Sequence, residues 1–299
     1  MAVKNLPASV LDRLRNQAKA EGITFQMALQ LFFQEEFLRK LSVSPYADNL
    51  VLKGGMFIYT LTEFDSRPTR DIDFLMQRLS NDLGRIEQIM KEICNTPSDN
   101  DFIRFEVTGS ERITPGKKYP GIRTRFLGRI NNVKVPFSID IGVDDVIIPD
   151  ASRRKIPTRL PDFESPEIYT YSLESTIVEK LDAILQRMET TSRMKDFYDI
   201  YYLSGMFDFD GVLLHKALKT TLLHRGRTAD PQAFEKILHF NESHFLNTQW
   251  KAFEPARSTG LSFDEVLTRT DIFLRPVYES ILNNGDFKLV WSCNTHQWN

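Results

Sequence analysis

The chain has 299 residues, of which 41% are hydrophobic and 26% are charged. This composition is ordinary for a folded protein and excludes global disorder, while the length predicts one large two-lobed unit or two closely packed domains. The 38 Lys and Arg residues nearly balance the 40 Asp and Glu residues, for a formal net charge of −2, so any attraction to nucleic acid or membrane must be local.

Neither the N-terminal residues nor the cysteines indicate export. The opening MAVKNLPASVLDRLRNQ becomes charged before the apolar core of a signal peptide can form, and no run of about 18 apolar residues occurs. Cys94 and Cys293 lie far apart and match no disulfide or metal-ligand framework. We therefore expect a cytoplasmic protein without a membrane partner.

The pattern of apolar residues and of chain-breaking residues changes along the chain. Residues 7–22 and 24–41 are predicted to form amphipathic helices, because apolar side chains recur at helical spacing. From Leu50 to about Pro149, short apolar segments broken by Gly, Pro and Asn predict strands, with one helix-like stretch near residues 80–94. A proline-rich connection follows, and helical periodicity then continues until the final WSCNTHQWN, which we expect to be irregular.

Two aspartates end the segment LKGGMFIYTLTEFDSRPTRDIDF. In a strand, Asp71 and Asp73 project to one face while Ile72 points into the core. Two carboxylates in one small volume repel each other unless one is protonated or a cation lies between them, and a hard ion such as Mg²⁺ is the usual solution. The alternative interpretation is a solvated strand edge.

Two further features strengthen the metal hypothesis. Gly54 and Gly55 predict a tight turn whose amides can approach a phosphate closely. In VPFSIDIGVDD the apolar residues alternate as a buried face, which leaves Asp140 on the other face, whereas Asp144 and Asp145 are expected in a turn. Three carboxylates on adjacent strands can hold two metal ions about 4 Å apart, which clamps the attacking and leaving oxygens in phosphoryl or nucleotidyl transfer.

The helical half of the chain offers further charged candidates. Lys180 and Arg187 fall two turns apart on one flank of a predicted helix over 167–189, where they could reach a phosphate or extend into solvent. In SRMKDFYDIYYL, Asp196 lies on the apolar face, so it is either a first-turn residue favoured by the helix dipole or a buried partner of a cation such as Lys180. Asp199 is expected to have a structural role.

A basic span separates the two aspartate segments. From Arg112 to Lys134 the chain carries seven basic residues and no acidic one. Such a span is often only a solvated face, but a place between the aspartate segments would put several charges where an RNA backbone or a nucleoside triphosphate requires them. Arg70 beside Asp71 and Lys53 beside the glycines belong to the same positive rim.

Four segments together resemble one known family. LKGGMFIYTL with SRPTRDIDF, then SIDIGVDD, EKLDAILQR and RMKDFYDIYYL, are similar to the AbiEii/AbiGii toxin family, within the nucleotidyltransferase superfamily that includes DNA polymerase beta. The resemblance covers roughly residues 45–205. Fifteen residues separate Gly55 from Asp71, which leaves the length of the intervening helix open.

The resemblance implies an α+β fold of the bilobed nucleotidyltransferase type. We expect a small mixed or antiparallel sheet with flanking helices, followed by a helical C-terminal lobe. The corresponding division is N-terminal helices over 1–45 packed on the core, a nucleotidyltransferase α/β core over 46–160, and a mainly helical lobe over 161–299 that completes the active-site cleft.

The resemblance also implies roles for particular residues. Metal ligands for Mg²⁺, two ions in this family, would be Asp71, Asp73 and Asp140. Further catalytic residues would be Lys180 and Asp196. The nucleoside triphosphate would be bound by Lys53, Gly54, Gly55, Arg70 and Arg187.

The implied reaction transfers a nucleotide from a nucleoside triphosphate, such as GTP, to an RNA acceptor such as tRNA. The protein would be the toxin of a bacterial toxin–antitoxin, or abortive infection, system, with a separately encoded antitoxin that acts as a repressor; direct contact between the two stays open. Alternatives are transfer to a small molecule of the antibiotic type, or a catalytically silent nucleotide- or RNA-binding module, which the intact aspartates disfavour.

Overall fold

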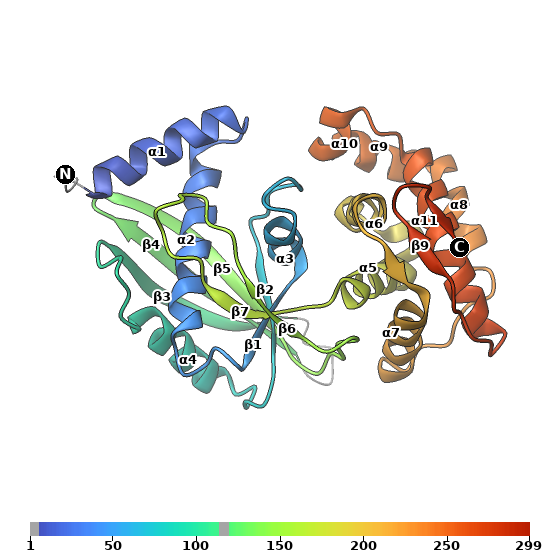
Figure 1. Ribbon diagram of the computed structural model, residues 1–299, viewed down its shortest axis with the longest axis horizontal. Coiled ribbons are helices and arrows are strands. Elements are labelled where there is room, and N and C mark those ends of the chain that lie inside the picture. The colour runs from blue at the N-terminus through green and yellow to red at the C-terminus, as the bar shows by residue number, and fades with distance from the viewer. Residues whose placement is uncertain (1–5, 114–119) are drawn as a thin grey trace. The chain divides into compact units, whose positions relative to one another are not determined.

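The computed structural model describes residues 6–113 and 120–299. Its contacts divide the chain into two compact units, each made of two segments (Figure 1): Met1–Asp144 with Ala151–Tyr171, and Asp145–Asp150 with Ser172–Asn299. Within the described ranges, no helix combines the length and the apolar character needed to cross a membrane.

A seven-stranded mixed sheet forms the centre of the first unit. Its strands are β1 (Leu50–Lys53), β2 (Ile72–Met76), β3 (Ile103–Ile113), β4 (Gly121–Ile130), β5 (Val133–Gly142), β6 (Ser152–Lys155) and β7 (Glu167–Thr170). The order across the sheet is β3-β4-β5-β2-β1-β7-β6, in which β2 and β5 are parallel, β1 and β7 are parallel, and the other neighbours are antiparallel. The predicted α+β fold class is confirmed.

In the described part of the first unit, four helices accompany this sheet: α1 (Leu6–Ala20), α2 (Phe25–Ser42), α3 (Gly54–Leu61) and α4 (Leu83–Asn95). In Figure 1, α2 lies across the sheet and α4 lies beside β3, while α1 packs on α2. Gly128 of β4 permits the close approach of α2, because a Cβ atom there would lie 2.6 Å from the Phe33 ring. The helices predicted over 7–22, 24–41 and near 80–94 are confirmed.

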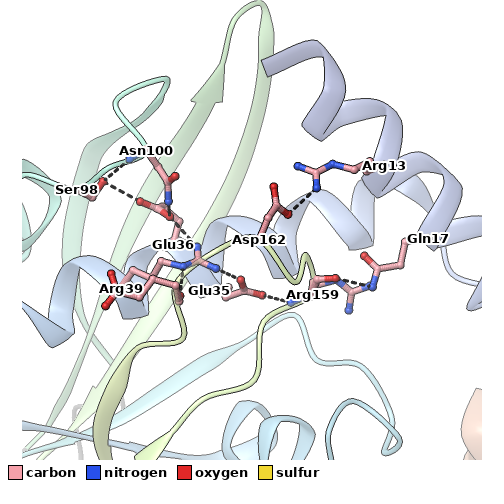
Figure 2. Close-up of polar contacts among 10 residues, drawn as sticks. Arg13, Gln17, Glu35, Glu36, Arg39, Ser98, Asn100, Arg159 and Asp162 are labelled. Atoms are coloured by element: carbon pink, nitrogen blue, oxygen red, sulfur yellow. Dashed lines mark hydrogen bonds and ion pairs between the residues drawn. The ribbon is translucent and has the colours of Figure 1, made fainter. Parts of the chain in front are cut away.

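Helix α2 carries four charged side chains into the interior: Glu35, Glu36, Arg39 and Lys40. Arg39 donates to Glu36 over 2.7 Å and also bonds to Glu35 (Figure 2). Asn100 and Ser98 donate to Glu36 over 2.7 and 3.0 Å. Such groups are tolerated inside a protein only when paired and hydrogen-bonded, because an uncompensated buried charge costs several kcal/mol.

The connection between β6 and β7 is tied to the same helices through Arg159. Its backbone N–H donates to Glu35 over 2.9 Å, and its guanidinium donates to the hydroxyl of Tyr59 over 2.7 Å and to Glu21 over 2.5 Å. The Gln17 side chain donates to the carbonyl of Arg159 (Figure 2). These long-range contacts fasten α1 and α2 to the rest of the unit.

The second unit is mainly helical. Its α-helices are α5 (Leu173–Arg187), α6 (Met194–Met206), α7 (Gly211–His224), α8 (Ala233–Leu238), α9 (His244–Ala252), α10 (Glu254–Thr259) and α11 (Phe263–Leu282), with 3-10 turns η1 (Met188–Thr190) and η2 (His239–Glu242). Helix α11 packs against α6, α7 and α8. It is the longest helix of the unit and begins with a capping box between Ser262 and Glu265.

The C-terminal residues are ordered, so the expectation of an irregular end was wrong. Short strands β8 (Phe209–Asp210), β9 (Val290–Ser292) and β10 (Gln297–Trp298) form a three-stranded sheet. Trp291 is 0% exposed and donates its indole N–H to the carbonyl of Ser204 over 2.7 Å. Trp298 stacks on Phe273 at 5.8 Å between ring centroids. Large aromatic surfaces of this kind stabilise even a short terminal segment.

The pH dependence of stability should report the burial of Glu36. Burial raises the pKa of this carboxyl to about 7, against the lowering effect of the hydrogen bonds from Asn100 and Ser98. Because the folded pKa exceeds the unfolded one, the stabilisation is full below the unfolded pKa and is lost as the pH rises through the folded pKa. From about pH 4.5 to about pH 7, the wild type should lose roughly 3 kcal/mol of unfolding free energy relative to Glu36→Gln.

Urea unfolding across this pH range measures the difference, and Glu242→Gln, which changes an exposed carboxyl, is the control. Parallel pH profiles for the wild type and Glu36→Gln would contradict the prediction.

Candidate active site

A row of charged side chains crosses four adjacent strands of the first unit. Lys53 of β1 lies opposite Asp73 of β2, and Asp73 lies opposite Asp140 of β5. On the far side of Asp140, Arg123 of β4 completes the row. Residues opposite one another in a sheet project to the same face. The structure therefore brings together the second predicted aspartate, the third predicted aspartate and two cations.

The two glycines are required by the close approach of their neighbours. Gly54 has a φ of +68°, and a Cβ atom there would lie 2.2 Å from Oδ2 of Asp73. A Cβ atom on Gly55 would lie 2.8 Å from Oγ1 of Thr69. The glycines also form the first turn of α3, where backbone N–H groups and the helix dipole favour an anion. Asp73 thus lies against a helix terminus suited to phosphate.

Helix α2 holds the peptide that precedes Asp71. Gln30 and Gln34 each donate a side-chain N–H to the carbonyl of Arg70, over 2.7 and 2.8 Å. The Thr69 hydroxyl donates to the carbonyl of Asp71 over 3.2 Å. Sequence reasoning missed both glutamines; their spacing of four residues, which puts them on one helix face, was the available signal.

Arg123 forms a bidentate ion pair with Asp140. Its Nε donates to Oδ1 over 2.7 Å and its Nη2 donates to Oδ2 over 2.6 Å. The hydrogen bonding to Asp140 raises the pKa of Arg123 above its usual range, against an opposing effect of burial and with support from the charges of Asp140 and Asp71. The sequence showed Arg123 only as one member of the basic span, because its partner depends on strand register.

The chemistry of these carboxylates fits a magnesium ion that arrives with a nucleotide. In residues 6–113 and 120–299, no three His, Cys, Asp or Glu side chains are gathered as a metal-binding group. Mg²⁺ is usually held by one or two carboxylates together with waters and substrate phosphates, rather than by a cage of protein ligands. A carboxylate has about four lone-pair sites, so Asp140 can bind Arg123 and still offer oxygen lone pairs to a cation.

The second unit contains a buried cluster of charges. Lys180 of α5 donates to Asp199 over 2.5 Å and to Asp196 over 3.4 Å, and Arg193 donates to Asp196 over 2.5 Å. Lys180, Asp196 and Asp199 are 8%, 1% and 2% exposed. Asp196 also lies in the first turn of α6, so both sequence interpretations of this residue apply. Arg187 is exposed at the last residue of α5.

Comparison with known proteins identifies similar chains. A family model described as "Nucleotidyl transferase AbiEii toxin, Type IV TA system" matches residues 36–269. Among solved structures, MenT4, a nucleotidyltransferase toxin from Mycobacterium tuberculosis H37Rv, is similar with a TM-score of 0.52 and 18% identity over 78% of this chain and 77% of that chain. JHP933 from Helicobacter pylori has a TM-score of 0.51 and 15% identity over 87% and 95% of the two chains. At these identities the two structures support the fold alone. No curated protein matches the chain.

Replacement of Gly54 should be more damaging than replacement of a glycine with the same backbone conformation. Gly22 has a φ of +67°, and a Cβ atom there would meet nothing within 4 Å, so Gly22→Ala isolates the backbone strain, which is about 1–2 kcal/mol. Gly54→Ala adds the displacement of Asp73 and should cost at least about 1 kcal/mol more. Urea unfolding of both variants measures the difference; equal losses would mean that Asp73 moves aside freely.

Removal of Lys180 should take a cation partner away from two buried carboxylates, Asp196 and Asp199. Lys180→Met is expected to lower the unfolding free energy by roughly 3–5 kcal/mol. The exposed Lys216 gives a matched control, because Lys216→Met should change the unfolding free energy by no more than about 0.5 kcal/mol. The double variant Lys180→Met with Asp199→Asn should recover part of the lost unfolding free energy, because the carboxylate that Lys180 pairs with is then neutral. If the effects of the two substitutions simply add in this double-mutant cycle, Lys180 and Asp199 do not stabilise each other.

Proposed function

The chain belongs to the nucleotidyl transferase AbiEii toxin family, and we propose that it transfers a nucleotide from a nucleoside triphosphate to an RNA acceptor. The observation that carries this proposal is the row of Asp73, Asp140 and Arg123 beside the glycine turn. The triphosphate would lie at the first turn of α3, where Gly54 and Gly55 permit close approach and the helix dipole favours negative charge.

The carboxylates of the row supply the chemistry. Asp71, Asp73 and Asp140 are the proposed ligands of Mg²⁺, with two ions expected, and the metal would neutralise charge that develops on the phosphates. Asp140 would accept the proton of the acceptor hydroxyl, whose oxygen forms a bond to the α-phosphorus while the bond to pyrophosphate breaks. Arg123 would hold Asp140 in one orientation during this exchange. Lys53 and Arg70 would balance charge on the phosphates.

The proposed RNA acceptor is supported by basic side chains on the same face of the sheet. Arg104 of β3 lies opposite Arg129 of β4, and Arg129 lies opposite Lys134 of β5. Like charges directly opposite one another destabilise a sheet, and only Arg129 of the three has a described ion pair, with Glu106. A polyanion would relieve this repulsion. Two other lysines of the basic span, Lys117 and Lys118, lie outside the described residues.

Residues of the second unit keep their proposed roles on the strength of the family resemblance. Lys180 and Asp196 are proposed catalytic residues, and the buried cluster gives them a structural role as well. Contact between the exposed Arg187 and the nucleotide stays a prediction. The family description names a type IV toxin–antitoxin system, which implies an antitoxin partner. The use of tRNA, a preference for GTP and a cytoplasmic location are parts of the same proposal.

Loss of one aspartate should abolish transfer. The protein is incubated with labelled nucleoside triphosphates, Mg²⁺ and total bacterial RNA, and the label in RNA is measured. Asp73→Asn should lower the rate by roughly a thousandfold, because a ligand for the metal and phosphates is lost. Asp48→Asn, which changes an exposed aspartate of the same unit, is the matched control and should leave the rate unchanged.

Transfer at the wild-type rate in Asp73→Asn would refute the enzymatic proposal. Label found in an aminoglycoside-type compound but not in RNA would reverse the assignment of the acceptor. Chelation of Mg²⁺ by EDTA should stop the wild-type reaction.

A further inference from the structure

We propose that a pocket beside Asp71 in the first unit is the acceptor subsite, and that it receives the terminal nucleotide of the RNA. This inference rests on the proposed function and adds a location for the acceptor. The pocket has a volume of about 430 Å³, within the usual range for ligand sites. Residues that line it include Arg70, Asp71, Arg123, Arg125, Leu127 and Ser138.

The order of the strands puts this pocket on the side from which an attacking group must come. The glycine turn follows β1, whereas the pocket is lined by β4, β5 and the residues just before β2, together with Gln30 of α2 and Thr108 of β3. Since β2 lies between β1 and β5, Asp73 of β2 lies between the glycine turn and the pocket. In nucleotidyl transfer the attacking and leaving oxygens lie roughly in line through the phosphorus. A triphosphate on the glycine turn therefore leaves the pocket side for the acceptor hydroxyl.

The register of β4 and β5 connects the pocket to the opposed basic side chains of Arg104, Arg129 and Lys134, here called the basic row. On the shared face, the pair of Arg123 and Asp140 is followed by Arg125 with Ser138, then by Leu127 with Pro136, and then by Arg129 with Lys134. The pocket is thus lined by the two residue pairs that lie between the pair of Arg123 with Asp140 and the basic row. Arg123 and Arg129 are six residues apart, or about 20 Å along the strand. An RNA strand bound along β4 would place phosphates on the basic row and its terminal nucleotide in the pocket.

The lining has the mixed chemistry that a nucleotide requires. Arg70 and Arg125 can pair with a phosphodiester, and Arg125 is held by one exposed carboxylate, Glu111, that a phosphate can replace. Leu127 and Pro136 provide an apolar surface for a base or sugar, and Ser138 adds a hydroxyl. A purely apolar small molecule would form no ion pair with Arg70 or Arg125.

Two substitutions test the pocket by different means. Arg125→Ala removes a phosphate partner, and Ser138→Trp fills the space. RNA affinity is measured by filter binding in the inactive Asp73→Asn background, and triphosphate affinity is measured with a fluorescent nucleotide. Each variant should weaken RNA binding roughly tenfold, as expected for a lost charged hydrogen bond or a blocked site, without change in nucleotide affinity.

A salt titration distinguishes the loss of one phosphate contact from a general loss of folded structure. Arg125→Ala should reduce the slope of log affinity against log salt by about one, because one phosphate contact is lost. Arg153→Ala is the matched control, since Arg153 is also a half-exposed strand arginine with one carboxylate partner, and it should leave RNA affinity and slope unchanged. Circular dichroism shows whether Ser138→Trp is folded; Arg125→Ala alters only an exposed side chain and carries the test if it is not.

The outcomes separate this inference from the proposed function. If the wild type labels RNA while both variants retain wild-type RNA affinity, the pocket is not the acceptor subsite and the proposed function stands. Weaker triphosphate binding with unchanged RNA binding would assign the pocket to the nucleotide instead and would overturn the inference. If the wild type labels no RNA, the proposed function fails and the inference fails with it.

Discussion

The candidate site depends on the absence of a side chain at Gly54. Oδ2 of Asp73 lies 2.2 Å from the place that a Cβ atom would take, so the carboxylate lies directly against the first turn of α3. The positive φ of this residue turns the chain directly from β1 into α3. One contact therefore sets both the position of the carboxylate and the direction of the helix terminus. The parallel pairing of β2 with β5 extends this arrangement to Asp140.

Charge compensation organises both units, but with different consequences. In the first unit Asp140 is paired with Arg123 on a partly exposed face, where a substrate or ion can compete for the carboxylate. In the second unit Lys180, Asp196 and Asp199 are buried, where competition by solvent is weak and each partner depends on the others. The same residue types thus form a partly exposed pair in one place and a buried cluster in the other.

Features set by local periodicity were predictable from the sequence, and features set by long-range pairing were not. The helices α1 and α2, the strand that carries Asp140 and the mixed fold followed from spacing and from the four family segments. The pairing of Arg123 with Asp140 depends on strand register, and the contacts of Gln30 and Gln34 with Arg70 depend on the packing of α2. The ordered C-terminus was missed because Trp291 and Trp298 also contact Phe273 and, for Trp291, the carbonyl of Ser204, which lie far away in sequence.

The division of the chain into units has a consequence for how the backbone connects them. The boundaries after Asp144, Asp150 and Tyr171 mean that the backbone passes from one unit to the other three times. Residues 145–150 belong to the second unit, where the Ser175 hydroxyl accepts from the N–H of Ile148 over 2.7 Å, although they precede β6 of the first unit. No single cut can therefore release an intact half, and neither lobe can be inherited, exchanged or lost as one continuous stretch of gene.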